Sequence, residues 1–129
     1  MKLEVGNRKS EGSDLKLRTF QFGLRCVRLA DALPQTRSGS AIGKQIVRCG
    51  TSVGANYRAA RRARSRAEFV AKLGIVEEEC DETLYWLEMI EALGSMKFES
   101  LKPLMQEADE ILSIIVTAIK TTKSKPLSK

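Results

Sequence analysis

The sequence predicts an all-α protein, an antiparallel up-and-down four-helix bundle. Aromatic residues make up only 5% of the chain while charged residues make up 29%, a mix that favours helices over sheets. Apolar residues also recur at helical spacing in four segments that short polar stretches separate. The chain of 129 residues, 43% of them hydrophobic, has the length and core of one domain and no room for a second.

The first helix is expected to start at Ser13, its N-cap, and to end at Leu33 because Pro34 follows. Residues 1–13 lack any apolar period, so they are expected to form a flexible tail. The apolar row that is expected to face the core consists of Leu17, Phe20, Leu24 and Val27. A polar loop, 35–39, is expected to follow the helix.

The second helix is expected from about Ser40 to about Arg64. Its apolar residues follow one another at intervals of three or four and form one continuous seam: Ile42, Ile46, Cys49, Val53, Tyr57 and Ala60. Residues 32–67 hold eight basic residues and no Asp or Glu. Five of them, Lys44, Arg48, Arg58, Arg62 and Arg66, fall within about 80° of one another at 100° per residue. They predict a basic stripe opposite the seam.

The third helix is expected to start at Ser65, which forms a capping box with Glu68, and to end at Leu93 because Gly94 follows. Eight of its residues are acidic, and after Arg66 at its start only Lys72 is basic. It carries two rows of side chains. The first consists of Phe69, Leu73, Val76, Cys80, Leu84 and Leu87, and the second of Ile75, Glu79, Glu82, Trp86 and Leu93.

The fourth helix is expected from its N-cap Ser100 to Thr122, with Pro103 tolerated in the first turn. Its apolar stripe consists of Leu104, Ala108, Ile111, Ile115 and Ala118. Residues 123–129 are expected to form a second flexible tail, so the bundle is expected to span 14–122.

The net charge of +6 and the basic stripe together point to polyanions. Guanidinium groups suit phosphate oxygens, and the release of counterions drives such binding. The residues expected to contact RNA or DNA are Lys44, Arg58, Arg61, Arg62, Arg64 and Arg66. The alternative is that part of this face is paired or buried, because small residues such as Gly54 and Ala55 let another helix approach.

Four residues are candidates for an interface between helices or between subunits: Arg48, Glu79, Glu82 and Trp86. Arg48 is expected to pair with Glu79 or Glu82. The second apolar row with the only Trp indicates self-association, and the alternative is that Trp86 caps the core of a single chain.

Catalytic and cofactor chemistry find little support in the sequence. Histidine is absent, which removes the commonest general base and metal ligand, and Ser38–Lys44 lacks the phosphate-loop spacing. Carboxylate pairs such as Glu79 and Glu82 remain the one option for acid–base work or a metal. We therefore expect no enzyme activity, no cofactor and no metal. Three unpaired cysteines and the lack of a signal peptide or membrane span favour reduced core thiols and a cytoplasmic location.

A combined pattern in the second and third helices resembles a known family. It comprises Gln45-Ile-Val-Arg48, Thr51-Ser-Val-Gly-Ala-Asn56-Tyr-Arg58 and Tyr85-Trp-Leu87. The chain is similar to the four-helix-bundle proteins encoded by intervening sequences of bacterial large-subunit ribosomal RNA genes. The resemblance implies a homopentamer with a basic surface and no enzymatic activity. It also implies kinship with the accessory protein of diversity-generating retroelements, a pentamer that binds nucleic acid and a reverse transcriptase. Many members carry an acidic residue where this chain has Ala59.

Two functions are therefore expected. The first is a non-catalytic, oligomeric, helical-bundle protein that binds RNA or DNA through phosphate contacts, without a role at the membrane. The alternative is a protein-interaction scaffold or accessory subunit, in which the same arginines meet acidic residues of a neighbouring subunit or partner.

Overall fold

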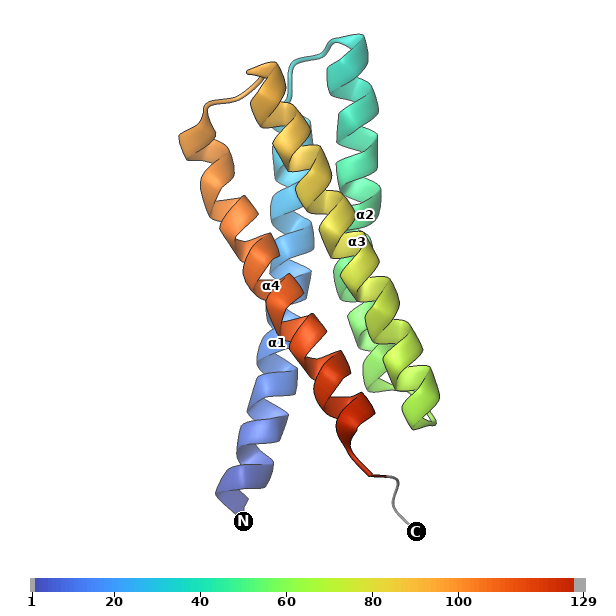
Figure 1. The fold of residues 1–129 in the computed structure, drawn as a ribbon. Helices are drawn as coiled ribbons and strands as arrows, with labels where there is room; N and C mark the ends of the chain where they lie inside the picture. The colour runs from blue at the N-terminus through green and yellow to red at the C-terminus, as the bar shows by residue number, and fades with distance from the viewer. Residues whose placement is uncertain (1, 127–129) are drawn as a thin grey trace.

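Four long helices make up the protein. The computed structural model describes residues 2–126 and places side chains from Asp14 to Pro126. The helices are α1 (Lys2–Ala32), α2 (Arg37–Arg61), α3 (Arg66–Leu93) and α4 (Phe98–Ser124). Each packs against the next one in the chain, and α4 returns to α1 over a shorter stretch (Figure 1). The prediction of an all-α four-helix bundle is confirmed.

The first helix begins earlier than the sequence predicts. α1 starts at Lys2 and runs through Ser13, so Ser13 is not its N-cap and residues 2–13 are helical. The backbone reason is that this segment contains no proline; Gly6 and Gly12 weaken a helix by about 1 kcal/mol each without ending it. The side chains of residues 1–13 lie outside the described part of the chain.

The predicted core row of α1 is wrong. Leu17, Phe20 and Leu24 point outward, with 54%, 60% and 39% of their surface exposed. The buried row is offset by two residues and consists of Leu15, Thr19, Phe22, Cys26, Leu29 and Leu33. Both rows repeat every three or four residues, so spacing alone does not distinguish them.

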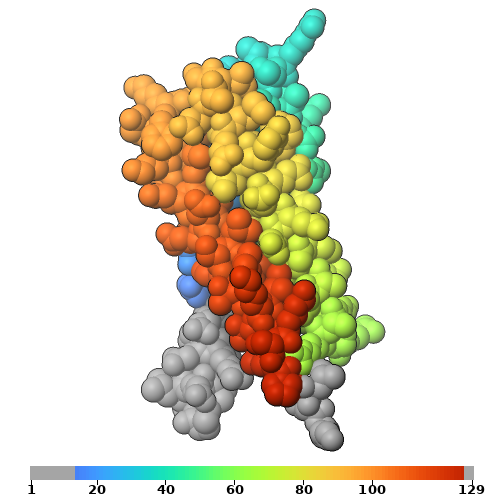
Figure 2. All heavy atoms as spheres, viewed as in Figure 1, coloured from blue at the N-terminus to red at the C-terminus, as the bar shows by residue number. Residues whose placement is uncertain are grey.

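The other three helices bury the rows that the sequence predicts. The whole α2 seam is buried, as are four residues of the first α3 row and four of the α4 stripe. Phe69, Leu84 and Ala118 pack against this core from partly buried positions. Figure 2 shows the side chains of α3 and α4 meeting along the face turned to the viewer.

The ends of α2 and α4 differ from the predicted ones. α2 begins three residues early because the Thr36 hydroxyl accepts a hydrogen bond from the Gly39 N–H at 3.0 Å. α4 begins at Phe98 rather than after Ser100, since the Ser100 N–H already bonds to the Lys97 carbonyl at 2.9 Å. Pro103 therefore lies in the second turn. α4 ends at Ser124, and residues 127–129 of the predicted tail lie outside the described residues.

The end of α3 is confirmed, and its start is confirmed with one change. Gly94 takes a left-handed conformation at φ 69° and donates to the Glu91 and Ile90 carbonyls. Ser65 accepts from the Glu68 N–H at 3.0 Å, as a capping box requires. The Glu68 carboxylate, however, accepts from the N–H of Arg64 at 2.7 Å, one residue before the cap.

Two contacts fasten α1 to its neighbours. Gly23, Gly50 and Gly54 bring α1 and α2 together at backbone distance: a Cβ on Gly54 would lie 3.1 Å from the Thr19 carbonyl oxygen. On the other flank, Arg18 donates two hydrogen bonds to Glu107, at 3.0 and 2.7 Å, and one to Glu110 at 3.0 Å. This link between α1 and α4 was not predicted from the sequence.

Candidate nucleic-acid interface and outward apolar surface

The turn between α2 and α3 carries three exposed arginines, Arg61, Arg62 and Arg64, called here the basic turn. The backbone N–H of Arg62 closes α2 by bonding to the Ala59 carbonyl at 3.1 Å. The guanidinium of Arg61 lies 3.5 Å from the Tyr57 hydroxyl, a contact at the outer limit of a hydrogen bond. Among residues 14–126, none of the three arginines forms an ion pair. Their charges are therefore available to solvent or a ligand.

Arg66 has a different role from the one that the sequence predicts. Its guanidinium donates to the backbone carbonyls of Thr122 and Lys125, at the C-terminal end of α4. Arginines stabilise this end of a helix because its last carbonyls lack partners and carry partial negative charge. The contact also brings the lysine-bearing end of α4 beside the basic turn. Arg66 is thus a link between helices rather than a free surface charge.

The remaining candidates, Lys44 and Arg58, lie along the flank of α2 that faces α1. They are about 21 Å apart along the helix axis, at about 1.5 Å per residue. Arg58 lines a groove between α1 and α2, and Lys44 lines a hollow of about 400 Å³ farther along the same two helices. The six predicted residues therefore do not form one patch: three form the basic turn, one links α4, and two border α1.

The four candidate interface residues meet within a single chain. Arg48 donates to Glu79 at 3.0 Å and, on its other nitrogen, to Glu82. Gln45 accepts from the same guanidinium at 3.2 and 3.1 Å. The indole N–H of Trp86 donates to Glu82 at 3.2 Å, and the ring packs against the core. These contacts join α2 to α3 and interrupt the basic stripe, because Arg48 is neutralised.

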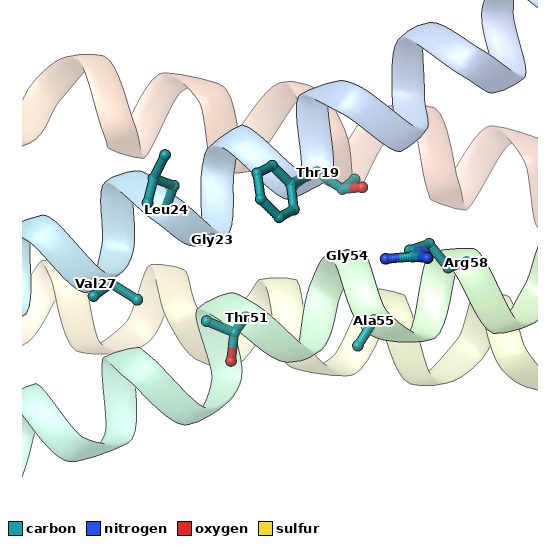
Figure 3. A pocket seen from close by; sticks show the side chains of 9 residues that line it. Thr19, Gly23, Leu24, Val27, Thr51, Gly54, Ala55 and Arg58 are labelled. Carbon is teal, nitrogen blue, oxygen red and sulfur yellow. The ribbon is translucent and has the colours of Figure 1, made fainter.

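The outward row of α1 comprises Leu17, Phe20, Leu24 and Val27, and all of these except Leu17 form one bank of the groove that contains Arg58. Glycines form its floor, since Gly23 and Gly54 hold the two helices close together. In Figure 3 the side chains of Leu24 and Val27 lie on the α1 bank, and the Arg58 side chain extends along α2 toward Gly54. The α1–α2 groove has a volume of about 330 Å³ and is lined by Thr19, Phe20, Gly23, Leu24, Val27, Thr51, Gly54, Ala55 and Arg58.

The three cysteines are free thiols, all of them buried. Burial raises the pKa of Cys26 and of Cys80 to about 12, so both stay protonated at neutral pH. Protonated, buried thiols are poor nucleophiles and poor metal ligands. Within the described residues, no group of Cys, Asp and Glu has a geometry that could hold a metal ion, and no helix is long and apolar enough to cross a membrane.

Comparisons with known proteins identify the family. The model of the 23S rRNA-intervening sequence protein family matches residues 13–117. The chain belongs to this family. A solved structure from Bacteroides thetaiotaomicron, described as a protein of unknown function from the S23 ribosomal protein family, is similar to it at 35% identity with a TM-score of 0.79. The match covers 84% of this intervening sequence protein and 97% of that chain. Curated proteins give no significant match.

Two parts of these surfaces were not predicted from the sequence. Lys123 and Lys125 lie at the end of α4 that Arg66 contacts, and the antiparallel order of helices could have placed them beside the α2–α3 turn. The outward row was identified as apolar but assigned to the core. The signal that could have corrected it was the second, equally regular row containing Phe22 and Cys26.

Proposed function

We propose that this intervening sequence protein is a non-catalytic, self-associating bundle that binds RNA or DNA through phosphate contacts at the basic turn. The observation that carries the proposal is the group of three exposed arginines that form no ion pair among residues 14–126, with α4 lysines placed nearby by Arg66. Guanidinium groups on a convex turn reach phosphate oxygens without entering a groove, so little base readout is expected. The buried, reduced thiols fit a cytoplasmic location.

The test is a salt series of fluorescence anisotropy with structured ribosomal RNA and with duplex DNA. Changing Arg61, Arg62 and Arg64 to Gln together should lower the slope of log Kobs against log salt by about three, roughly one for each lost phosphate contact. The matched control changes Arg37, Lys97 and Lys102, at the opposite end of the bundle, to Gln. The control should keep the slope of the wild type.

Two results would remove the nucleic-acid proposal. One is no binding to either nucleic acid at low salt by the intact protein. The other is an equal loss of slope in the turn variant and the control, because this would show that net charge rather than the basic turn governs binding.

Self-association is supported by the outward row of α1, since three large apolar side chains exposed on one helix face mark an interaction surface. The resemblance adds the expectation of five copies. This row also favours the second candidate function, a protein-interaction scaffold, in which α1 rather than the Trp86 row makes the contact. Sedimentation velocity over a range of protein concentrations tests it, and a single-chain mass throughout would refute self-association.

A further inference from the structure

The α1–α2 groove has one apolar bank and one basic bank, so only one kind of partner surface fits it. Its α1 bank is apolar and bulky, because Phe20 and Leu24 are exposed and line the groove. Its α2 bank is basic, with Arg58 in the groove and Lys44 in the hollow farther along, which Asp31 of α1 also lines. Neither cation forms an ion pair among residues 14–126. The surface that fits must therefore offer space for large apolar side chains and carry acidic groups beside that space.

The outward face of α3 offers both. Glu78, Asp81 and Glu88 are exposed there, and no ion pair among residues 14–126 involves them. Small residues precede these acidic groups on the same face: Ala67 and Ala71 are exposed, and a Cβ on Gly74 would meet nothing within 4 Å. Tyr85, which is 51% exposed, adds an aromatic surface on the same face.

The charged stretches of the two surfaces differ in length by about one helical turn. Glu78 and Glu88 lie about 15 Å apart along α3, against about 21 Å between Lys44 and Arg58 on α2, at about 1.5 Å per residue. A groove packed against the groove of another copy would instead oppose Lys44 and Arg58 to like charges, which is unfavourable. The occupant that fits is thus a different face of the same protein.

We propose that the α1–α2 groove of one copy receives the outward face of α3 of a second copy. This contact is heterologous, since each copy uses one face as acceptor and the other as donor. The inference rests on the proposed self-association and identifies its two faces. It also divides the predicted phosphate-binding residues: Lys44 and Arg58 serve the contact between copies, while the basic turn stays free for nucleic acid.

The first experiment compares apolar variants by sedimentation velocity. Phe20→Ser with Leu24→Ser should raise the concentration at which the assembly dissociates roughly a hundredfold, because each interface anchor is worth about a factor of ten or more. The matched control, Leu93→Ser with Phe98→Ser, changes two exposed apolar residues near the α3–α4 connection and should leave the assembly unchanged. Circular dichroism checks that each variant is folded.

The second experiment identifies the partner face. Lys44→Glu with Arg58→Glu should dissociate the assembly, and so should Glu78→Arg with Glu88→Arg. A chain that carries all four changes should assemble again, because the charges of both faces are then exchanged. Recovery in this chain supports the pairing of the groove with α3.

The outcomes distinguish a failure of the proposed interface from a failure of self-association. A wild-type protein that sediments as one chain at every concentration refutes self-association and this interface together. An oligomer that persists in the Phe20 and Leu24 variant overturns the groove while self-association stands. Dissociation by the charge changes without recovery in the four-change chain overturns α3 as the partner face.

Discussion

The helices α1 and α3 each carry two apolar rows, but the second rows of the two helices have different neighbours. The second row of α3 lies beside α2, where Glu82 accepts hydrogen bonds from both Arg48 and Trp86. The second row of α1 borders the open α1–α2 groove and is not covered by another helix, and Phe20 is the most exposed of its large side chains. The periodicity of a sequence therefore shows how many faces of a helix are apolar. Which of them is covered depends on the polar partners that neighbouring helices supply.

The largest change in the free energy of unfolding is expected from substitutions in the two rows of α1. Phe22→Ala removes a fully buried ring and should lower the free energy of unfolding by about 3 to 5 kcal/mol. Phe20→Ala removes a ring that is mostly in water, so its effect on a single chain should stay below about 1 kcal/mol. Urea denaturation followed by circular dichroism, at a protein concentration low enough to keep the chains apart, measures both.

A second measurement at high protein concentration sharpens this result. Phe20→Ala should then lose stability relative to the wild type, because binding to another copy stabilises only the folded state that offers the outward row. Equal losses for Phe20→Ala and Phe22→Ala in the dilute protein would contradict the assignment of the two rows.

The fold could be predicted from the sequence because three helices have one dominant row each or a clear cap. The α2 seam and the Gly94 stop depend on local chemistry, so the prediction is correct there. The orientation of α1 could not be predicted, since Leu17 and Leu15 start rows of equal regularity and only packing against α2 decides between them. The contacts of Arg66 could not be predicted either, because its partners are backbone carbonyls near the other end of the chain.

The candidate site could be predicted only where its residues are close in the sequence. The basic turn consists of consecutive residues, so its arginines had to be close together whatever the packing. The pairing of Arg48 with Glu79 and Glu82 was open in the sequence, where it competed with exposure to a phosphate. The structure brings the three residues together because their helices are neighbours.

An intermediate effect is expected from two glycines that differ in the space around them. A Cβ on Gly50 would lie 2.6 Å from the Cβ and Sγ of Cys26, closer than such atoms approach, so Gly50→Ala forces α1 and α2 apart. We expect a loss of about 1 to 3 kcal/mol, the usual cost of overpacking. Gly74→Ala on α3 meets nothing and should gain up to about 1 kcal/mol from helix propensity.

Thermal unfolding of the dilute protein measures both changes, and the same substitution in two helices serves as its own control. A gain in both variants would mean that α1 and α2 do not touch at backbone distance. The contrast between the second rows of α1 and α3 would then be lost, because nothing would fix the orientation of α1 that leaves its outward row exposed.

The smallest change in stability is expected from removing the charge of Glu82, which lies in the second row of α3. Glu82→Gln keeps an acceptor for the Trp86 indole N–H but removes the charge that Arg48 contacts, so the emission of this single Trp should change little. The stability lost should be smaller than in Gly50→Ala, since about half of the Arg48 side chain is in water. Glu91→Gln changes an exposed carboxylate of the same helix outside the proposed contact between copies; it is the control and should cost nothing measurable. The loss in Glu82→Gln should also vanish near 1 M salt, where charges are screened beyond about 3 Å. A loss that persists in 1 M salt would contradict an electrostatic role for Glu82, and the second row of α3 would then not depend on the charge of the Arg48–Glu82 pair.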